Sequence, residues 1–185
     1  MTLETERLIL RPWKPDDAER LFLLAKDPDV GPAAGWNPHL SVAESRDVID
    51  TIFHLPTIYA VVLKESGEVI GCCGTMPDPT LSSNDREQLL GYWIGKPYWD
   101  DGYATEAAQK TIHHAFRDLG LSVIWCGCFA ENTKSLRVQE KLGFVIHHIE
   151  QENTSWSDEP RNVIITRLEY QKAQASAEDK ECNDL

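Results

Sequence analysis

The segment "WDDGYAT", residues 99–105, combines a glycine with small residues between a predicted strand and a predicted helix. The N-terminus of a helix presents unpaired backbone N–H groups and the positive end of the helix dipole, which together favour a phosphate. Gly102 allows a ligand to approach the backbone, and Ala104 and Thr105 are small enough for a pyrophosphate to lie against the first turn. A capped helix without a ligand is the alternative that these residues leave open.

Two carboxylates in this segment oppose a phosphate site. Asp100 and Asp101 would repel a pyrophosphate by about 1 kcal/mol or more at a half-exposed site. We therefore expect their side chains to face solvent or to cap the helix, with Lys96 offsetting part of the charge.

A second candidate site lies in "ENTKSL", residues 131–136. Asn132 and Ser135 are three residues apart at a predicted helix start, so both side chains can face one cleft. Both residue types also suit helix capping, and a purely structural role stays open on these residues alone.

The elements that must position these segments alternate between strand and helix periodicity. We expect strands at 7–13, 57–63, 68–76, 86–95, 122–129, 145–152 and 161–170, and helices at 14–28, 42–55, 102–120 and 132–143. Ser41 followed by Glu44 predicts a capping box before the second helix. The order predicts an α/β (α+β) fold in which helices flank a mixed sheet.

Composition limits the class of protein. The chain has 185 residues, 42% of them hydrophobic, which suits one domain over residues 1–170, followed by a polar tail over 171–185. A formal net charge of -12 argues against nucleic acid and anionic membranes as direct partners. Because we find no signal peptide or membrane span, we expect a cytoplasmic protein. The spacing of the five cysteines and the paired histidines predicts no metal site.

Three segments together carry a family resemblance: "TERLILRPWKPDDA", "GYWIGKPYWDDGYATEA" and "NTKSLRVQEKLGF". In this order they resemble the GNAT superfamily of N-acetyltransferases, specifically its RimJ/RimL-like branch, over residues 4–168. The resemblance implies the GNAT acyl-CoA N-acyltransferase fold, with a mostly antiparallel sheet of about seven strands and about four helices.

The resemblance also implies acetyl-CoA as the acetyl donor. Its pyrophosphate would lie on a Gln/Arg-x-x-Gly-x-Gly/Ala loop, which residues 99–104 match except that tryptophan replaces the usual Gln or Arg. The strand before the loop would splay from its neighbour, and its backbone would pair with the pantetheine arm and polarise the acetyl carbonyl. The implied cofactor-binding residues are Trp93, Ile94, Trp99, Gly102, Tyr103, Ala104, Thr105, Asn132 and Ser135.

Two positions depart from the catalytic pattern of the family. Gln139 stands where many relatives have a tyrosine, so the resemblance favours Ser135 as the acid toward the departing thiolate. Leu89 stands where relatives commonly have a glutamate, and we expect His39 to act as the base, with Glu87 and Asp85 as runners-up. The residues expected to bind the acceptor are Trp36, Asn37, His39 and Tyr92, with Trp156 in a further loop.

The expected reaction is transfer of an acetyl group to a primary amine in a ternary complex. The acceptor could be a protein N-terminus or a small amine such as an amino acid, a polyamine or an aminoglycoside. A catalytically inactive acyl-CoA-binding module is the alternative, while a nucleotide-binding enzyme lacks its usual glycine motifs. We expect a monomer or homodimer.

Overall fold

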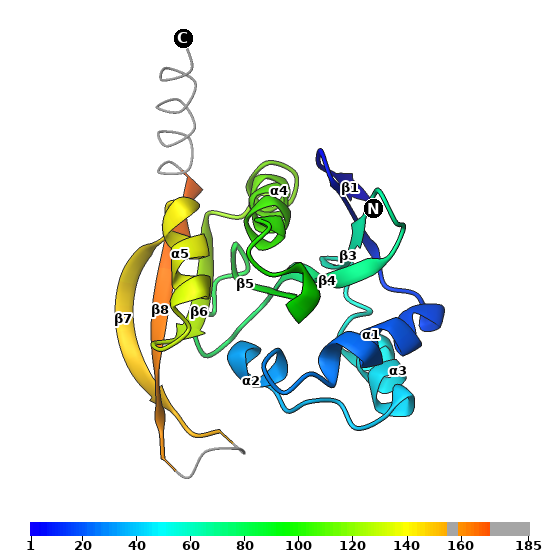
Figure 1. Ribbon diagram of the computed structural model, residues 1–185. Coiled ribbons are helices and arrows are strands. Elements are labelled where there is room, and N and C mark those ends of the chain that lie inside the picture. The colour runs from blue at the N-terminus through cyan, green and yellow to red at the C-terminus, as the bar shows by residue number, and fades with distance from the viewer. Residues whose placement is uncertain (155–158, 171–185) are drawn as a thin grey trace.

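One sheet of eight strands organises the chain, and the computed structural model describes residues 1–154 and 159–170 (Figure 1). In these ranges the strand order is β1-β2-β3-β4-β5-β6-β8-β7. The strands are β1 (Leu3–Glu4), β2 (Leu8–Pro12), β3 (Ile58–Leu63), β4 (Val69–Met76), β5 (Glu87–Ile94), β6 (Val123–Phe129), β7 (Val145–Glu152) and β8 (Arg161–Glu169). All neighbours are antiparallel except β5 and β6, which are parallel.

Helices cover both faces of this sheet (Figure 1). They are α1 (Ala18–Ala25), α2 (Gly31–Ala34), α3 (Val42–Thr51), α4 (Tyr103–Arg117) and α5 (Thr133–Lys141), with 3-10 turns η1 (Pro15–Asp17) and η2 (Lys96–Tyr98). α1 and α3 pack together on one face, and α4 packs against β4 and β5 on the other, with α5 beside it.

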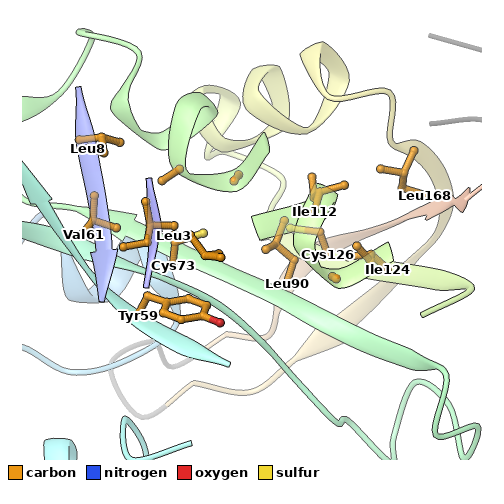
Figure 2. Close-up of a cluster of buried hydrophobic side chains, with 14 of the residues drawn as sticks. Leu3, Leu8, Tyr59, Val61, Cys73, Leu90, Ile112, Ile124, Cys126 and Leu168 are labelled. Carbon is orange, nitrogen blue, oxygen red and sulfur yellow. The ribbon is translucent and has the colours of Figure 1, made fainter. Parts of the chain in front are cut away.

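The largest core cluster lies between the sheet and α4 (Figure 2). Ala107, Ala108, Ile112, Ala115 and Phe116 are all buried, and their helical spacing turns one side of α4 toward the strands. α4 starts after Gly102, which has a left-handed φ of 82° that glycine adopts without strain. The buried apolar side of α4 and the glycine before it therefore determine the position and the start of this helix, and its N-terminus lies at the end of the segment that follows β5.

The predicted α/β architecture, a mostly antiparallel sheet flanked by helices, is confirmed, and the described ranges hold eight strands and five helices rather than about seven and about four. The cap before α3 is also present, because Ser41 Oγ accepts a hydrogen bond from Glu44 N at 3.1 Å. The two-residue β1 and the four-residue α2 were not expected, since neither is long enough to produce a periodic pattern. Trp156 and the predicted tail over 171–185 lie outside the described residues.

Within the described part of the chain, no helix combines the length and apolar character that crossing a membrane requires. Residues 1–154 and 159–170 likewise contain no group of three or more His, Cys, Asp or Glu side chains that could hold a metal ion.

Candidate active site

A cleft of about 1130 Å³ opens where β5 and β6 separate in the middle of the sheet. The two strands pair only at Glu87–Val123, Gln88–Ile124 and Leu89–Trp125. From Leu90 onward, β5 stays paired with β4 but has no partner on its β6 side among the described strands. The segment 90–94 therefore has one edge of its backbone facing the cleft.

The register identifies which backbone groups face the cleft. Gly95 N donates to Ile70 O on β4 at 2.8 Å, and the N–H and C=O groups of a strand alternate in direction from residue to residue. The backbone groups of Trp93 therefore point at β4, whereas those of Tyr92 and Ile94 point toward the cleft. Of the two residues expected to pair with pantetheine, Ile94 has this orientation and Trp93 does not, and Tyr92 is the other residue of this segment whose backbone groups face the cleft.

The loop after β5 is tied to that strand by Trp99. Its indole Nε1 donates to Ile94 O at 2.6 Å, which holds residues 99–102 at the mouth of the cleft. The loop then turns through two left-handed residues, Asp100 with a φ of 69° and Gly102. Gly102, Tyr103, Ala104 and Thr105 all line the cleft at the start of α4. The tryptophan that departs from the family pattern thus has a structural role as an anchor.

The two aspartates of this loop are exposed, as expected, although Asp100 is also among the residues that line the cleft. The Asp100 carboxylate is exposed and forms an ion pair with Lys134 Nζ at 2.7 Å, and Asp101 is also exposed. The expectation for Lys96 was wrong, because its ammonium pairs with Asp29 instead. Lys134 on α5 provides the compensating charge, and it also lies 5.1 Å from the centre of the Trp99 ring.

Arg7, the residue directly before β2, braces the same loop. Its Nη1 donates to Asp101 O at 3.0 Å, and its guanidinium stacks over the Tyr103 ring at 4.4 Å. Glu106, in the first turn of α4, accepts hydrogen bonds from Thr5 Oγ1 at 2.6 Å, Arg7 N at 2.9 Å and Arg7 Nε at 2.7 Å. Burial opposes ionisation of Glu106, but these hydrogen bonds outweigh it and lower the pKa of the carboxyl. Arg7 therefore offsets a fixed negative charge beside the loop.

Three basic residues on α5 were missed in the sequence. Lys134, Arg137 and Lys141 all line the cleft. Their spacing of three and four residues places them on one face of the helix, and this pattern could have identified them. Together with the N-terminus of α4, they make this end of the cleft suitable for the phosphates of a nucleotide.

The predicted cap at Asn132 is present. Asn132 Oδ1 accepts a hydrogen bond from Ser135 N at 3.1 Å, and its Nδ2 donates to Ala33 O at 3.0 Å. Both polar atoms of the side chain thus hold the start of α5 in place. Asn132 and Ser135 both line the cleft, as their spacing predicted.

Ser135 lies in a hydrogen-bonded cluster with Tyr92. The Tyr92 hydroxyl is 2.9 Å from Ser135 Oγ and 3.1 Å from Ser135 O, and Gln139 Nε2 is 3.3 Å from Ser135 Oγ. Burial raises the pKa of Tyr92 and also that of the neighbouring Cys128 thiol. Tyr92, expected at the acceptor, thus has its hydroxyl group at Ser135, across the cleft from β5.

A second group of side chains in the cleft lining is acidic, and we call this part of the cleft its acidic end. Its lining includes Asp78, Glu131, Glu150 and Glu152, next to apolar side chains such as Leu89. Glu131 is paired with Arg161 at 2.6 Å, and Glu150 lies 3.4 Å from His148 Nε2. The cleft lining therefore combines cationic side chains on α5 with carboxylates on β7 and in the loops after β4 and β6.

His39 is not among the described residues that line this cleft. Its Nδ1 lies 2.7 Å from Ser45 Oγ on α3, its ring contacts Trp36, and burial lowers its pKa. Trp36 packs edge-on against Trp93 at 5.8 Å, and Asn37 is exposed in the same loop. These three residues are thus adjacent to one another, but the structure does not bring them to the cleft wall.

The two runners-up for the base also lie off the cleft lining in the described residues. The Glu87 carboxylate accepts hydrogen bonds from Trp125 Nε1 at 2.9 Å and from Asn84 Nδ2 at 3.1 Å. Asp85 is exposed on the loop before β5.

Sequence comparison defines the family. The family model described as "Acetyltransferase (GNAT) domain" matches residues 7–145, so the chain belongs to the GNAT acetyltransferases. The chain is 36% identical over 149 residues to "Uncharacterized N-acetyltransferase p20" of Bacillus licheniformis, a match that covers 77% of this chain and 82% of the relative. It is 31% identical over 147 residues to "Uncharacterized N-acetyltransferase YoaA" of Bacillus subtilis, covering 77% and 81% of the two chains.

Solved structures agree on the fold. A GNAT-family acetyltransferase from Bacillus anthracis superimposes with a TM-score of 0.82 at 22% identity, covering 92% of this chain and 99% of that one. Spermidine N-acetyltransferase from Vibrio cholerae, solved with CoA and spermine, gives 0.76 at 18% identity and covers 92% and 99% of the two chains. At these identities the likeness concerns the fold alone.

The residues of the cleft fit an acyl-CoA. The outward-facing backbone of Tyr92 and Ile94 offers strand-type pairing to an extended arm, and the α4 N-terminus with Lys134 and Arg137 offers sites for phosphates.

Proposed function

We propose that this chain transfers the acetyl group of acetyl-CoA to a primary amine. One observation carries the proposal: β5 leaves β6 after Leu89, and the opened cleft leads to the glycine-started N-terminus of α4. A thioester donor held in this cleft would present its acetyl carbon to an attacking amine. The membership of the chain in the GNAT family supports the same reaction class.

The roles of the chain's own residues follow from where they lie. The backbone of Tyr92 and Ile94 binds the extended arm, and the Ile94 N–H is the donor available to the carbonyl oxygen, where negative charge develops during attack. Residues 99–105, with Lys134 and Arg137, hold the phosphates. Binding both substrates side by side would itself supply much of the rate.

We further propose Ser135 as the acid of the reaction. The amine nitrogen forms the new C–N bond, the C–S bond breaks with its electron pair on sulfur, and Ser135 Oγ gives its proton to that sulfur. Ser135 regains a proton through water from the amine, which loses one, so the net products are an amide and a thiol. The position of Ser135 on the wall of the cleft supports this role.

The carboxylates at the acidic end of the cleft favour an acceptor that carries a positive charge in addition to the reacting amine. Asp78 and Glu152 line it without an ion pair to a basic side chain in the described ranges. Within the expected acceptors, this favours polyamines, aminoglycosides and peptides with a basic side chain near a free N-terminus. Cytoplasmic location, a single domain over 1–170 and a monomer or homodimer remain part of the proposal.

The experiment that tests the function is thiol release from acetyl-CoA, followed with a thiol-reactive dye. The panel contains amino acids, polyamines, aminoglycosides and short peptides with free N-termini, each at matched concentration. We expect thiol release with at least one cationic amine and none without an acceptor. The binding-only alternative would be indicated by two results together: CoA binds in a thermal-shift assay, and no thiol is released with any amine of the panel or with any folded protein substrate.

A further inference from the structure

We propose that Tyr92, Gln139 and Thr166 are positioning residues that aim the Ser135 hydroxyl proton into the cleft. This inference rests on the proposed function, in which that proton passes to sulfur. It explains why a glutamine, which cannot supply a proton, occupies the position where many GNAT enzymes have a tyrosine.

The hydrogen-bonding capacity of Ser135 is the first step of the argument. A serine hydroxyl carries one proton and two acceptor lone pairs. Gln139 Nε2 lies 3.3 Å from Ser135 Oγ and can only donate to it, and the Tyr92 hydroxyl lies 2.9 Å away. When both neighbours donate, both lone pairs are filled, and the serine proton is left for a partner in the cleft that Ser135 lines.

Thr166 fixes the orientation of the Gln139 amide. The Thr166 hydroxyl lies 2.7 Å from Gln139 Oε1, the usual length for an O–H group that donates to oxygen, and 3.2 Å from Cys126 O. The shorter contact takes the single hydroxyl proton. With Oε1 accepting from Thr166, the Nε2 group turns toward Ser135, and both Gln139 and Thr166 are only 1% exposed, which shields this contact from bulk solvent.

Tyr92 acts as a donor rather than as the source of the transferred proton. Its hydroxyl is closer to Ser135 Oγ, at 2.9 Å, than to Ser135 O, at 3.1 Å. Burial disfavours the phenolate, so the phenol keeps its proton and can donate a hydrogen bond throughout the reaction. Tyr92 thus assists Ser135 without exchanging a proton with it.

Neutron diffraction of the deuterium-exchanged protein tests the arrangement without reference to activity. We expect the deuterons of Tyr92 Oη and Gln139 Nε2 to point at Ser135 Oγ, and the Ser135 deuteron to point into the cleft. A Ser135 deuteron directed at Gln139 Oε1 or at Tyr92 Oη would overturn the proposal, even in a protein that proves active. Conversely, a protein without turnover can still show the expected deuterons, so the two failures are distinguishable.

Kinetics of isosteric variants test the consequence. Thr166→Val removes the group that orients Gln139, and we expect a drop in kcat of about tenfold with an unchanged KM for acetyl-CoA. The matched control is Thr111→Val, which removes another buried threonine hydroxyl, bonded to Ala107 O on α4, and should keep the wild-type kcat. In a Ser135→Ala background, Thr166→Val should have no further effect, because there is no hydroxyl left to orient.

Tyr92→Phe separates positioning from proton donation. We expect a lower kcat at every pH and an unchanged shape of the pH–rate profile. Loss of a titrating group from the profile would make Tyr92 a proton donor, and an unchanged kcat in both Tyr92→Phe and Thr166→Val would refute the positioning role.

Discussion

The two ends of the cleft are built in different ways. At the phosphate end, one continuous segment, residues 99–105, supplies backbone groups; its own Trp99 ties it to β5, and Arg7 and Lys134 hold it from two other parts of the chain. At the acidic end, single side chains from the loop before β5, from the loop after β6 and from β7 line the wall, and most are exposed. A common donor can be held by a fixed backbone, whereas acceptor choice depends on a few separate side chains.

Gly102→Glu should have the largest effect and should act only at the phosphate end. The glutamate would put a negative charge at the start of α4, and at ~5 Å and an effective dielectric of ~20 this costs about 3 kcal/mol per phosphate charge. We expect CoA affinity to fall more than about a hundredfold in isothermal titration calorimetry.

Gly120→Glu is the matched control for this variant. Gly120 also has a left-handed φ, of 70°, and a Cβ there would meet nothing within 4 Å. Both variants should lose similar stability from backbone strain, but only Gly102→Glu should lose CoA binding. Wild-type CoA affinity in Gly102→Glu would refute the assignment of the phosphate site.

Ser135→Ala changes a residue between the phosphate end and the acidic end of the cleft, and it should lower the turnover number. Loss of a general acid lowers kcat by about a hundredfold or more, while backbone binding of the cofactor is kept. The measurement is kcat by thiol release, together with the Kd for CoA. A normal rate in this variant would remove Ser135 from the mechanism.

The sequence could predict the parts of the site that neighbouring residues define, but not the contacts between residues far apart in the chain. The segment 99–105 and the pair Asn132 and Ser135 are local patterns, because neighbours along the chain define a helix start. Arg7 and Glu106 are 99 residues apart, and Tyr92 and Ser135 are 43 apart, so only the folded sheet brings each pair together. Lys134 rather than Lys96 pairs with the loop for the same reason.

The acceptor end was the least predictable. Its carboxylates come from separate segments with no shared pattern. Residues 33–35 of the segment before α3 do line the cleft, but His39 is not in the lining, and its Nδ1 lies 2.7 Å from the buried Ser45 Oγ on α3. Strand and helix order followed from periodicity, but loop conformation depended on contacts that no local pattern reveals.

Arg7→Met should have an intermediate effect. It keeps apolar packing over Tyr103 but leaves Glu106 without its cation, and a charge ~8 Å from a phosphate costs about 2 kcal/mol at an effective dielectric of ~20. We expect CoA affinity to fall about thirtyfold. Arg11→Met, which breaks a similar pair with Asp17 at 2.7 Å, should leave CoA affinity unchanged.

The stability of Arg7→Met should depend on pH. The folded pKa of Glu106 is lowered, so its ion pair stabilises the fold above the unfolded pKa of about 4.3 and is lost as pH falls through the folded value. The wild type should be more stable than the variant by about 1 kcal/mol at pH 7, as for a partly exposed pair, and the difference should shrink below about pH 4. A difference that is constant with pH would show that the guanidinium acts through packing alone.

Glu152→Gln should have a small effect, confined to the acceptor. An exposed carboxylate contributes about 0.2–1 kcal/mol to an ion pair, so the KM for a polycationic acceptor should rise about twofold to fivefold. The KM for acetyl-CoA should not change, and added salt should reduce the difference between wild type and variant. Glu65→Gln, the same charge change in the β3–β4 turn, is the control, and an equal effect there would indicate net charge rather than a local contact.

His39→Asn should have the smallest effect on catalysis. Asparagine keeps a polar atom for Ser45, and the side chain lies outside the cleft lining, so kcat should stay within about twofold. Because burial lowers the folded pKa of His39, the wild type loses stability as pH falls below the unfolded value of about 6.5, and its difference from the variant should shrink there. If instead the variant loses the acidic limb of its pH–rate profile, which reports deprotonation of the base, the acceptor loop closes over the cleft during turnover, and His39 returns as the base.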